Sequence, residues 1–103
     1  MHIISKKPFS AASTKYPNDR DAIMNIYNVL RKAEFDTPNI MKETFTSLDN
    51  FKYKDKWWVI DIGGNNLRLI AAILFSSQKM YVKHIVTHAE YDKLCIQYRK
   101  GAH

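Results

Sequence analysis

The change of hydrophobic period to two from residue 51 onward is the feature of this sequence that most restricts its fold. From residue 57 to residue 87 the chain reads WWVIDI, GGNN, LRLIAAILF, SSQK and MYVKHIVT, so β-prone runs alternate with short polar turns. Runs rich in β-branched and aromatic residues, broken by such turns, predict an antiparallel meander. A hairpin that turns within GGNN places Asp61 opposite Arg68 and Ile62 opposite Leu67.

The run LRLIAAILF is apolar on both faces apart from Arg68, which is typical of a central strand covered on one side by helices. Upstream, FKYKDK continues the period of two and predicts a further strand with a row of lysines on one face: Lys52, Lys54 and Lys56. Trp57 and Trp58 follow and point to opposite faces, so at most one belongs to the core. The other is expected to be exposed for a partner chain.

The first half of the chain has helical periodicity instead. MHII predicts a short strand, and Ser5 caps a first helix that has to end before Pro17. Asn18 caps a second helix over residues 19–35, whose apolar stripe is Ile23, Ile26, Tyr27, Leu30 and Ala33. Residues 36–50 show no sustained period and predict a connection with no more than a turn or a short strand.

A last helix is predicted over residues 89–99, AEYDKLCIQYR. The element order is therefore a short strand, two helices, a connection, a meander of three or four strands and a terminal helix. This order predicts a mixed α/β (α+β) fold, and a length of 103 residues fits one domain, residues 1–103, around one core.

The charge balance favours a polyanionic partner. The net charge is +6 at pH 7, and most of the basic excess lies in the second half of the chain. No apolar run approaches the roughly 18 residues of a membrane span, and MHIISKKPF lacks the apolar centre of a signal peptide. These features predict a cytoplasmic protein without a membrane partner. Cys95, the single cysteine, has no second thiol for a disulfide or a zinc site.

Three phrases carry a resemblance to a known family: NFKY where the sheet begins, GGNNLRL at the hairpin and THAEYDK where the last strand ends. Each is weak alone, but together and in this order they are specific. The chain resembles the RelE-like HigB toxins, which are ribosome-dependent mRNA interferases of bacterial type II toxin-antitoxin systems.

The resemblance implies a RelE-like fold, in which two helices pack on one face of a twisted antiparallel sheet and the other face receives mRNA. It implies an endoribonuclease that cleaves message on the translating ribosome and so inhibits translation and growth. The implied partners are the ribosome with its mRNA and a HigA-like helix-turn-helix antitoxin, with which the toxin forms a hetero-oligomer. Composition and spacing by themselves do not point to the ribosome.

Metal-free RNA cleavage needs a base for the 2′-hydroxyl, a cation for the charged phosphorane and an acid for the leaving 5′-oxygen. Arg68 is the best candidate for the cation, because its fork of donors matches two phosphate oxygens at once. The alternative is a cross-strand ion pair with Asp61. The two interpretations are compatible, since one carboxylate does not use all five donors.

His88 stands where a strand gives way to a helix, and imidazole titrates near neutral pH, so it is a candidate acid or base. Around it, Thr87 and Glu90 fit a capping box, which is a structural role. Tyr91 is a further catalytic candidate beside Arg68, His88 and Lys83. Its ring can stack on a base, and its hydroxyl can donate a hydrogen bond to a phosphate. Alternatively, the side chain only packs against its neighbours.

Lys83 and His84 are expected on opposite faces of the last strand, and the residue pattern does not decide which face is buried. The family resemblance favours Lys83 as the second phosphate contact beside Arg68. The row of Lys52, Lys54 and Lys56 is a candidate RNA-binding site, or else a solvated row that protects a sheet edge. No metal-ligand set and no cofactor motif is present, so neither is predicted.

A second functional interpretation belongs to a different class: a basic RNA- or protein-binding module of the same fold without catalytic activity. The sequence separates the two only weakly, because His84 and His88 are its only neutral-pH groups in this region.

Overall fold

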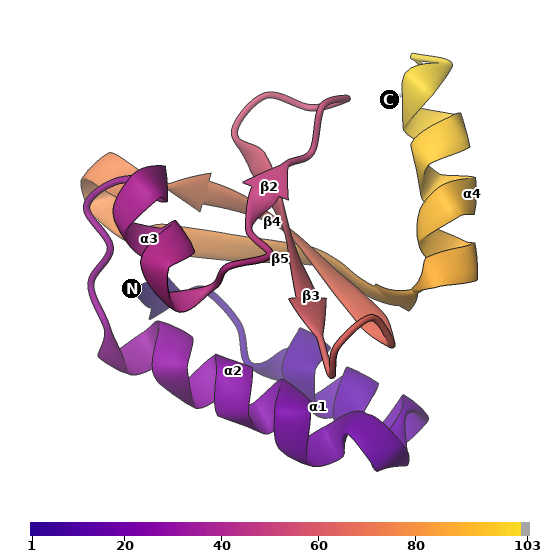
Figure 1. Ribbon diagram of the computed structural model, residues 1–103, viewed down its shortest axis with the longest axis horizontal. Helices are drawn as coiled ribbons and strands as arrows, with labels where there is room; N and C mark the ends of the chain where they lie inside the picture. The colour runs from indigo at the N-terminus through magenta and orange to yellow at the C-terminus, as the bar shows by residue number, and fades with distance from the viewer. Residues whose placement is uncertain (102–103) are drawn as a thin grey trace.

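The computed structural model describes residues 1–101, which form one sheet with helices on both of its sides (Figure 1). The elements in chain order are β1 (His2–Ile3), α1 (Lys7–Lys15), the 3₁₀ helix η1 (Pro17–Asp19), α2 (Arg20–Lys32), α3 (Pro38–Thr44), β2 (Asp49–Asn50), β3 (Trp57–Ile62), β4 (Leu67–Leu74), the 3₁₀ helix η2 (Phe75–Ser77), β5 (Lys79–Thr87) and α4 (His88–Arg99). This order confirms the predicted α+β class.

The sheet has the strand order β1-β5-β4-β3-β2 within the described residues. Strands β3, β4 and β5 form the predicted antiparallel meander, and β1 pairs in parallel with β5 at one edge. Asp61 pairs with Arg68 and Ile62 with Leu67, so the predicted hairpin register is confirmed. β4 is the central strand, in agreement with its apolar sequence.

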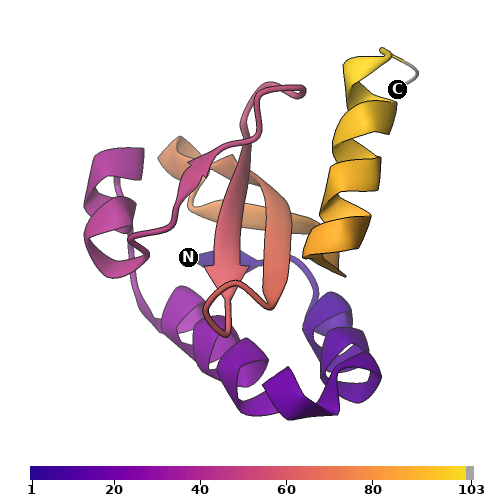
Figure 2. The ribbon, with the colours of Figure 1, turned by 45° about the vertical axis from the view of Figure 1, so that its right-hand side comes forward.

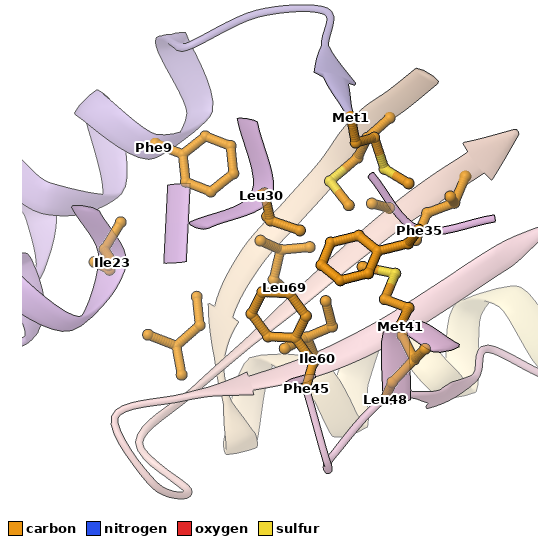
Figure 3. Close-up of a cluster of buried hydrophobic side chains, with 14 of the residues drawn as sticks. Met1, Phe9, Ile23, Leu30, Phe35, Met41, Phe45, Leu48, Ile60 and Leu69 are labelled. Atoms are coloured by element: carbon orange, nitrogen blue, oxygen red, sulfur yellow. The ribbon is translucent and has the colours of Figure 1, made fainter. Parts of the chain in front are cut away.

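The main hydrophobic core lies between one face of the sheet and the N-terminal helices (Figure 3). Phe9 of α1, Leu30 of α2 and Met41 of α3 meet Ile60 and Leu69 of the sheet, and all five side chains are buried. Burying one such side chain contributes about 1.5–3 kcal/mol. This core fixes the helical layer to one face, which confirms the packing that the family resemblance implies.

The boundaries of α2 differ from the predicted ones. Asn18 is not its cap, because Pro17–Asp19 forms a 3₁₀ turn and the α-helix begins at Arg20. The helix ends at Lys32, since Ala33 adopts extended backbone angles that lead Phe35 into the core. Helix ends are the least certain part of a prediction from hydrophobic periodicity, because the spacing of apolar residues can continue past the last helical residue.

The connection before the sheet contains a helix that the sequence pattern did not reveal. Pro38 begins α3, and the Thr37 hydroxyl accepts a hydrogen bond from the Ile40 amide at 3.2 Å. Proline is favoured at a first helical position, where its missing N–H costs nothing. The prediction of a connection with only a turn or a short strand is therefore wrong for residues 38–44.

Residues 51–56 are a loop, so the predicted strand with a lysine row is also wrong. Turn hydrogen bonds run from the Lys54 amide to the Phe51 carbonyl and from the Trp57 amide to the Lys54 carbonyl. Lys56 has a φ angle of 63°, in the left-handed region that strands do not use. Phe51 is buried at 2% exposure, and its inward turn breaks the alternation.

Helix α4 covers the other face of the sheet (Figure 2). Thr87 and Glu90 form the predicted capping box at its start. Tyr91, Leu94 and Tyr98 of α4 pack against a small second cluster of buried residues from the loop and strands: Phe51, Val59 and Ile70. No residue of α4 is itself buried, so the helix rests on this face through one partly exposed side.

Candidate functional site

Arg68 lies on the face of the sheet that α4 covers, between Asp61 and Tyr91. Its Nε is 3.4 Å from Oδ1 of Asp61 on the paired strand. Its Cζ is 4.5 Å from the centroid of the Tyr91 ring in α4. The predicted cross-strand pair is therefore present, and the guanidinium is held from two sides. Its fork has more donors than one carboxylate consumes, so it can also bind a phosphate.

A pocket of about 230 Å³ opens beside Arg68. Its lining residues are Ser47, Asp49, Asn50, Val59, Asp61, Arg68 and Tyr91. The Ser47 hydroxyl accepts a hydrogen bond from the Asp61 amide at 2.9 Å, which ties this wall to β3. Sequence reasoning missed residues 47–50, because they follow a segment without any period and pair only briefly with β3.

Tyr91 forms the aromatic wall of this pocket. Burial, and next the neighbouring Cys95 thiol, raise the pKa of Tyr91 to about 12, although the charge of Arg68 acts in the opposite direction. The hydroxyl therefore carries its proton at neutral pH. Tyr91 can donate a hydrogen bond or a proton but cannot serve as a base under these conditions.

His88 is the first residue of α4 and is half-buried. Arg68 of β4 pairs with Val86 of β5, and His88 comes two residues after Val86. Arg68 and His88 therefore lie at the same end of neighbouring strands, as the sequence predicted. The His88 Nε2 atom is buried and has no hydrogen-bond partner within residues 1–101. One nitrogen of the His88 ring therefore makes no hydrogen bond in this part of the chain. Among residues 1–101, no hydrogen bond or ion pair joins His88 to Arg68.

A β-bulge interrupts the side-chain alternation of β5. Ile70 pairs with His84, whereas the next residue of β4, Ala71, pairs with Val82, so Lys83 is an extra residue in its strand. A bulge inserts a residue that the partner strand does not match, and it turns the local backbone. The expectation that Lys83 and His84 lie on opposite faces is therefore wrong.

Both side chains reach the face that holds Arg68. His84 Nε2 lies 3.0 Å from the Tyr98 hydroxyl of α4, and burial followed by the charge of Lys83 lowers the pKa of His84. The Lys83 Nζ lies 5.7 Å from the centroid of the Trp57 ring on the same face. The contact between His84 and Tyr98 was not predicted, because it depends on where α4 packs against the sheet.

The loop at residues 51–56 sets lysines over aromatic rings. Lys52 Nζ lies 5.3 Å from the Tyr53 ring centroid, and Lys54 Nζ lies 6.0 Å from that of Trp57 and 5.8 Å from that of Tyr98. A pocket of about 450 Å³ is lined by Asn50, Phe51, Lys52, Lys54, Asp55, Lys56 and Trp57. Single-stranded RNA sites combine basic side chains with aromatic rings on which bases stack, and this loop contains both kinds of residue.

Trp57 and Trp58 lie on opposite faces, which confirms that prediction. Trp57 packs on Phe51 and Tyr98, at centroid distances of 5.8 and 5.4 Å, and Trp58 packs on Phe75 at 5.8 Å. Both indoles are half-buried, so the expected exposed tryptophan for a partner chain is not present.

Metal ligands do not gather in the part of the chain that the structure describes: no three His, Cys, Asp or Glu side chains come together as a metal site. In the same residues, none of the helices has the length and apolar character needed to cross a membrane.

The packing of the N-terminal helices on one face of the sheet matches the fold that the resemblance to the RelE-like toxins implies. A family model described as HigB_toxin, the RelE-like toxic component of a toxin-antitoxin system, matches residues 19–94. The chain belongs to this HigB family.

Curated relatives agree with this assignment. The chain is 54% identical to "mRNA interferase HigB" of Escherichia coli O6:H1 over 101 residues, which cover 98% of each chain. It is 44% identical over 92 residues to "mRNA interferase toxin HigB" of Escherichia coli K12 and to "mRNA interferase HigB" of Shigella flexneri, and the match covers 89% of this chain and 88% of each relative.

Proposed function

We propose that this toxin is a metal-independent endoribonuclease that cleaves mRNA on the translating ribosome and thereby stops protein synthesis. Its membership of the HigB family and its similarity to curated mRNA interferases support the reaction class. The single observation that carries the proposal is the guanidinium of Arg68, which lies between Asp61 and Tyr91 in the lining of a pocket.

In the proposed reaction the 2′-oxygen of the message attacks the adjacent phosphorus after it loses its proton to a base. The bond from phosphorus to the 5′-oxygen breaks, and an acid returns a proton to that oxygen, which leaves a 2′,3′-cyclic phosphate and a 5′-hydroxyl. Arg68 binds the phosphate and stabilises the charge that develops on it. A charge-stabilising donor of this kind contributes on the order of a hundredfold or more in rate.

His88 is the proposed proton donor or acceptor, because it begins α4 two residues after Val86, the strand partner of Arg68. Tyr91, whose hydroxyl keeps its proton at neutral pH, acts as a hydrogen-bond donor. Lys83 adds a second positive charge on the same face, near Trp57. Lys52, Lys54 and Lys56 hold the phosphates of the neighbouring nucleotides.

As the toxic component of a toxin-antitoxin system, the protein has an antitoxin as its partner. We expect a HigA-like helix-turn-helix antitoxin with an acidic segment, which the net charge of +6 attracts, and a hetero-oligomer as the resting complex. The other partners are the ribosome and its mRNA, which gives the toxin a cytoplasmic site of action.

The test is growth after induced expression of the wild-type chain, Arg68→Ala and, as a matched control, Arg20→Ala. Arg20 is an exposed arginine at the start of α2 on the helical layer. Wild type and Arg20→Ala should arrest growth, and Arg68→Ala should not. If wild type binds ribosomes but leaves message intact, the protein is instead a binding module without catalytic activity.

A further inference from the structure

A polar cluster joins α1 to the first turn of α4. The Tyr16 hydroxyl donates a hydrogen bond to Glu90 Oε1 at 2.8 Å, and Lys15 Nζ lies 3.6 Å from Glu90 Oε2. Oε1 also accepts hydrogen bonds from the amide and the hydroxyl of Thr87, each at 3.1 Å. We call Lys15, Tyr16, Thr87 and Glu90 the α1–α4 clasp. One carboxylate thus caps α4 and ties its start to α1.

The capping box alone does not require Tyr16. A capping box needs only the residues corresponding to Thr87 and Glu90, which lie three positions apart. Tyr16 is 74 positions away from Glu90, and its ring packs against the main core. The start of α4 is also restrained by strand β5, which it follows directly, and because α4 has no buried residue, the hydrogen bond from Tyr16 adds a restraint from the main core.

The first turn of α4 carries groups of the proposed chemistry. His88 is its first residue, and Tyr91 holds the Arg68 guanidinium over its ring at 4.5 Å. A displacement of this turn moves both groups relative to Arg68, whereas the lysines at residues 51–56 belong to a separate loop. A misplacement of about 1 Å can cost on the order of a hundredfold in rate.

We propose that Tyr16 is a positioning residue of this toxin, which acts through Glu90 to set His88 and Tyr91 in place relative to Arg68. The inference rests on the proposed function and adds a residue from the helical layer, on the other side of the sheet, to the cleavage step. It predicts that Tyr16 affects the rate of cleavage and not the binding of the message.

The experiment measures single-turnover cleavage of ribosome-bound message over a range of toxin concentrations. Tyr16→Phe removes only the hydroxyl, and the matched control Tyr27→Phe removes a hydroxyl that makes no hydrogen bond in the described residues while its ring packs on Phe9. Tyr16→Phe should cleave about tenfold more slowly at saturating toxin, with a half-saturating concentration within about twofold of wild type. Tyr27→Phe should match wild type in both.

Glu90 provides a second measurement through a conservative pair of variants. Glu90→Gln keeps an oxygen that accepts from Tyr16 and Thr87, and glutamine is compatible with a capping box. It should retain most of the saturating rate, whereas Glu90→Ala should lose at least as much as Tyr16→Phe. The melting temperature of each variant, measured in parallel, shows that the proteins compared are folded.

A wild-type saturating rate for Tyr16→Phe, beside an inactive Arg68→Ala, would overturn this inference and leave the proposed function standing. A Tyr16→Phe defect confined to the half-saturating concentration would overturn it as well. Absence of cleavage by the wild-type chain itself would overturn the proposed function, and this inference with it.

Discussion

The two faces of the sheet differ in what covers them. On the face of α1, α2 and α3, aliphatic side chains such as Leu69 and Ile60 are almost completely buried in one continuous core. On the face of α4, the buried hydrophobic residues within residues 1–101 are Phe51, Val59 and Ile70, and aromatic and cationic side chains surround them. The difference indicates that the helical face supplies most of the buried core. If the α4 face carries the proposed RNA chemistry, variants of the two faces should affect stability and activity separately.

The largest effect is expected on the helical face. Leu69→Ala removes a fully buried side chain from the central strand, and such truncations cost about 2–5 kcal/mol in the free energy of unfolding. Urea denaturation of the purified protein measures this loss. Lys83→Ala, an exposed position on β5, should change stability by less than about 0.5 kcal/mol. Equal losses for the two variants would contradict the division between the faces.

The next largest effect is expected on the α4 face and concerns activity. Arg68→Ala and His88→Ala should each reduce cleavage on the order of a hundredfold or more, while both keep their fold and their binding to the antitoxin. The double variant should be scarcely worse than either single variant, because groups that act as one unit are not additive. A fully toxic His88→Ala would restrict His88 to the helix start and leave proton transfer to Lys83, Tyr91 or the ribosome.

A smaller effect is expected at Lys56, whose φ angle of 63° suits glycine. Lys56→Gly removes the charge without adding backbone strain. If this lysine contacts a phosphate, the variant should bind RNA more weakly and the slope of log affinity against log salt should fall by about one. Titration of a labelled RNA at several salt concentrations measures the slope, and an unchanged slope would remove Lys56 from the RNA site.

The smallest effect concerns acid stability through the α1–α4 clasp. The backbone amide of Thr87, and then the Tyr16 hydroxyl, lower the pKa of Glu90 from its ordinary value of 4.5 to about 2. A lowered folded-state pKa stabilises the protein above pH 4.5, and this contribution is lost as the pH falls toward 2. Unfolding free energies measured across that interval should therefore decline more for wild type than for Glu90→Gln. Parallel declines would show that the Glu90 charge contributes nothing.

Much of the fold was predictable because its signals are local. The hairpin register around Asp61 and Arg68 follows from the turn sequence, and the capping box of α4 follows from the spacing of Thr87 and Glu90. Helix α3 was missed because Pro38 was weighed as part of a connection, although proline also begins helices.

The candidate site was harder to predict, because tertiary contacts decide it. The loop at residues 51–56 exists because Phe51 turns into the second cluster, and no alternation pattern reveals that turn. The bulge changes the pairing with β4 and brings Lys83 to the face of Arg68, where His84 already lies by regular alternation with Val86. The contact of Arg68 with Tyr91 depends on where α4 packs, which the sequence of α4 does not specify.

The measurement that tests the central claim most directly is a cross-linking map of the message on the toxin. Message that contains 4-thiouridine near the cleavage site is bound to ribosomes with the Arg68→Ala variant, which should leave it uncut, and is then irradiated. The cross-linked peptides are identified by mass spectrometry. We predict cross-links to residues 51–57 and 81–91, on the α4 face of the sheet. Cross-links confined to α1 and α2, with none in those two segments, would contradict the claim that this face receives the RNA.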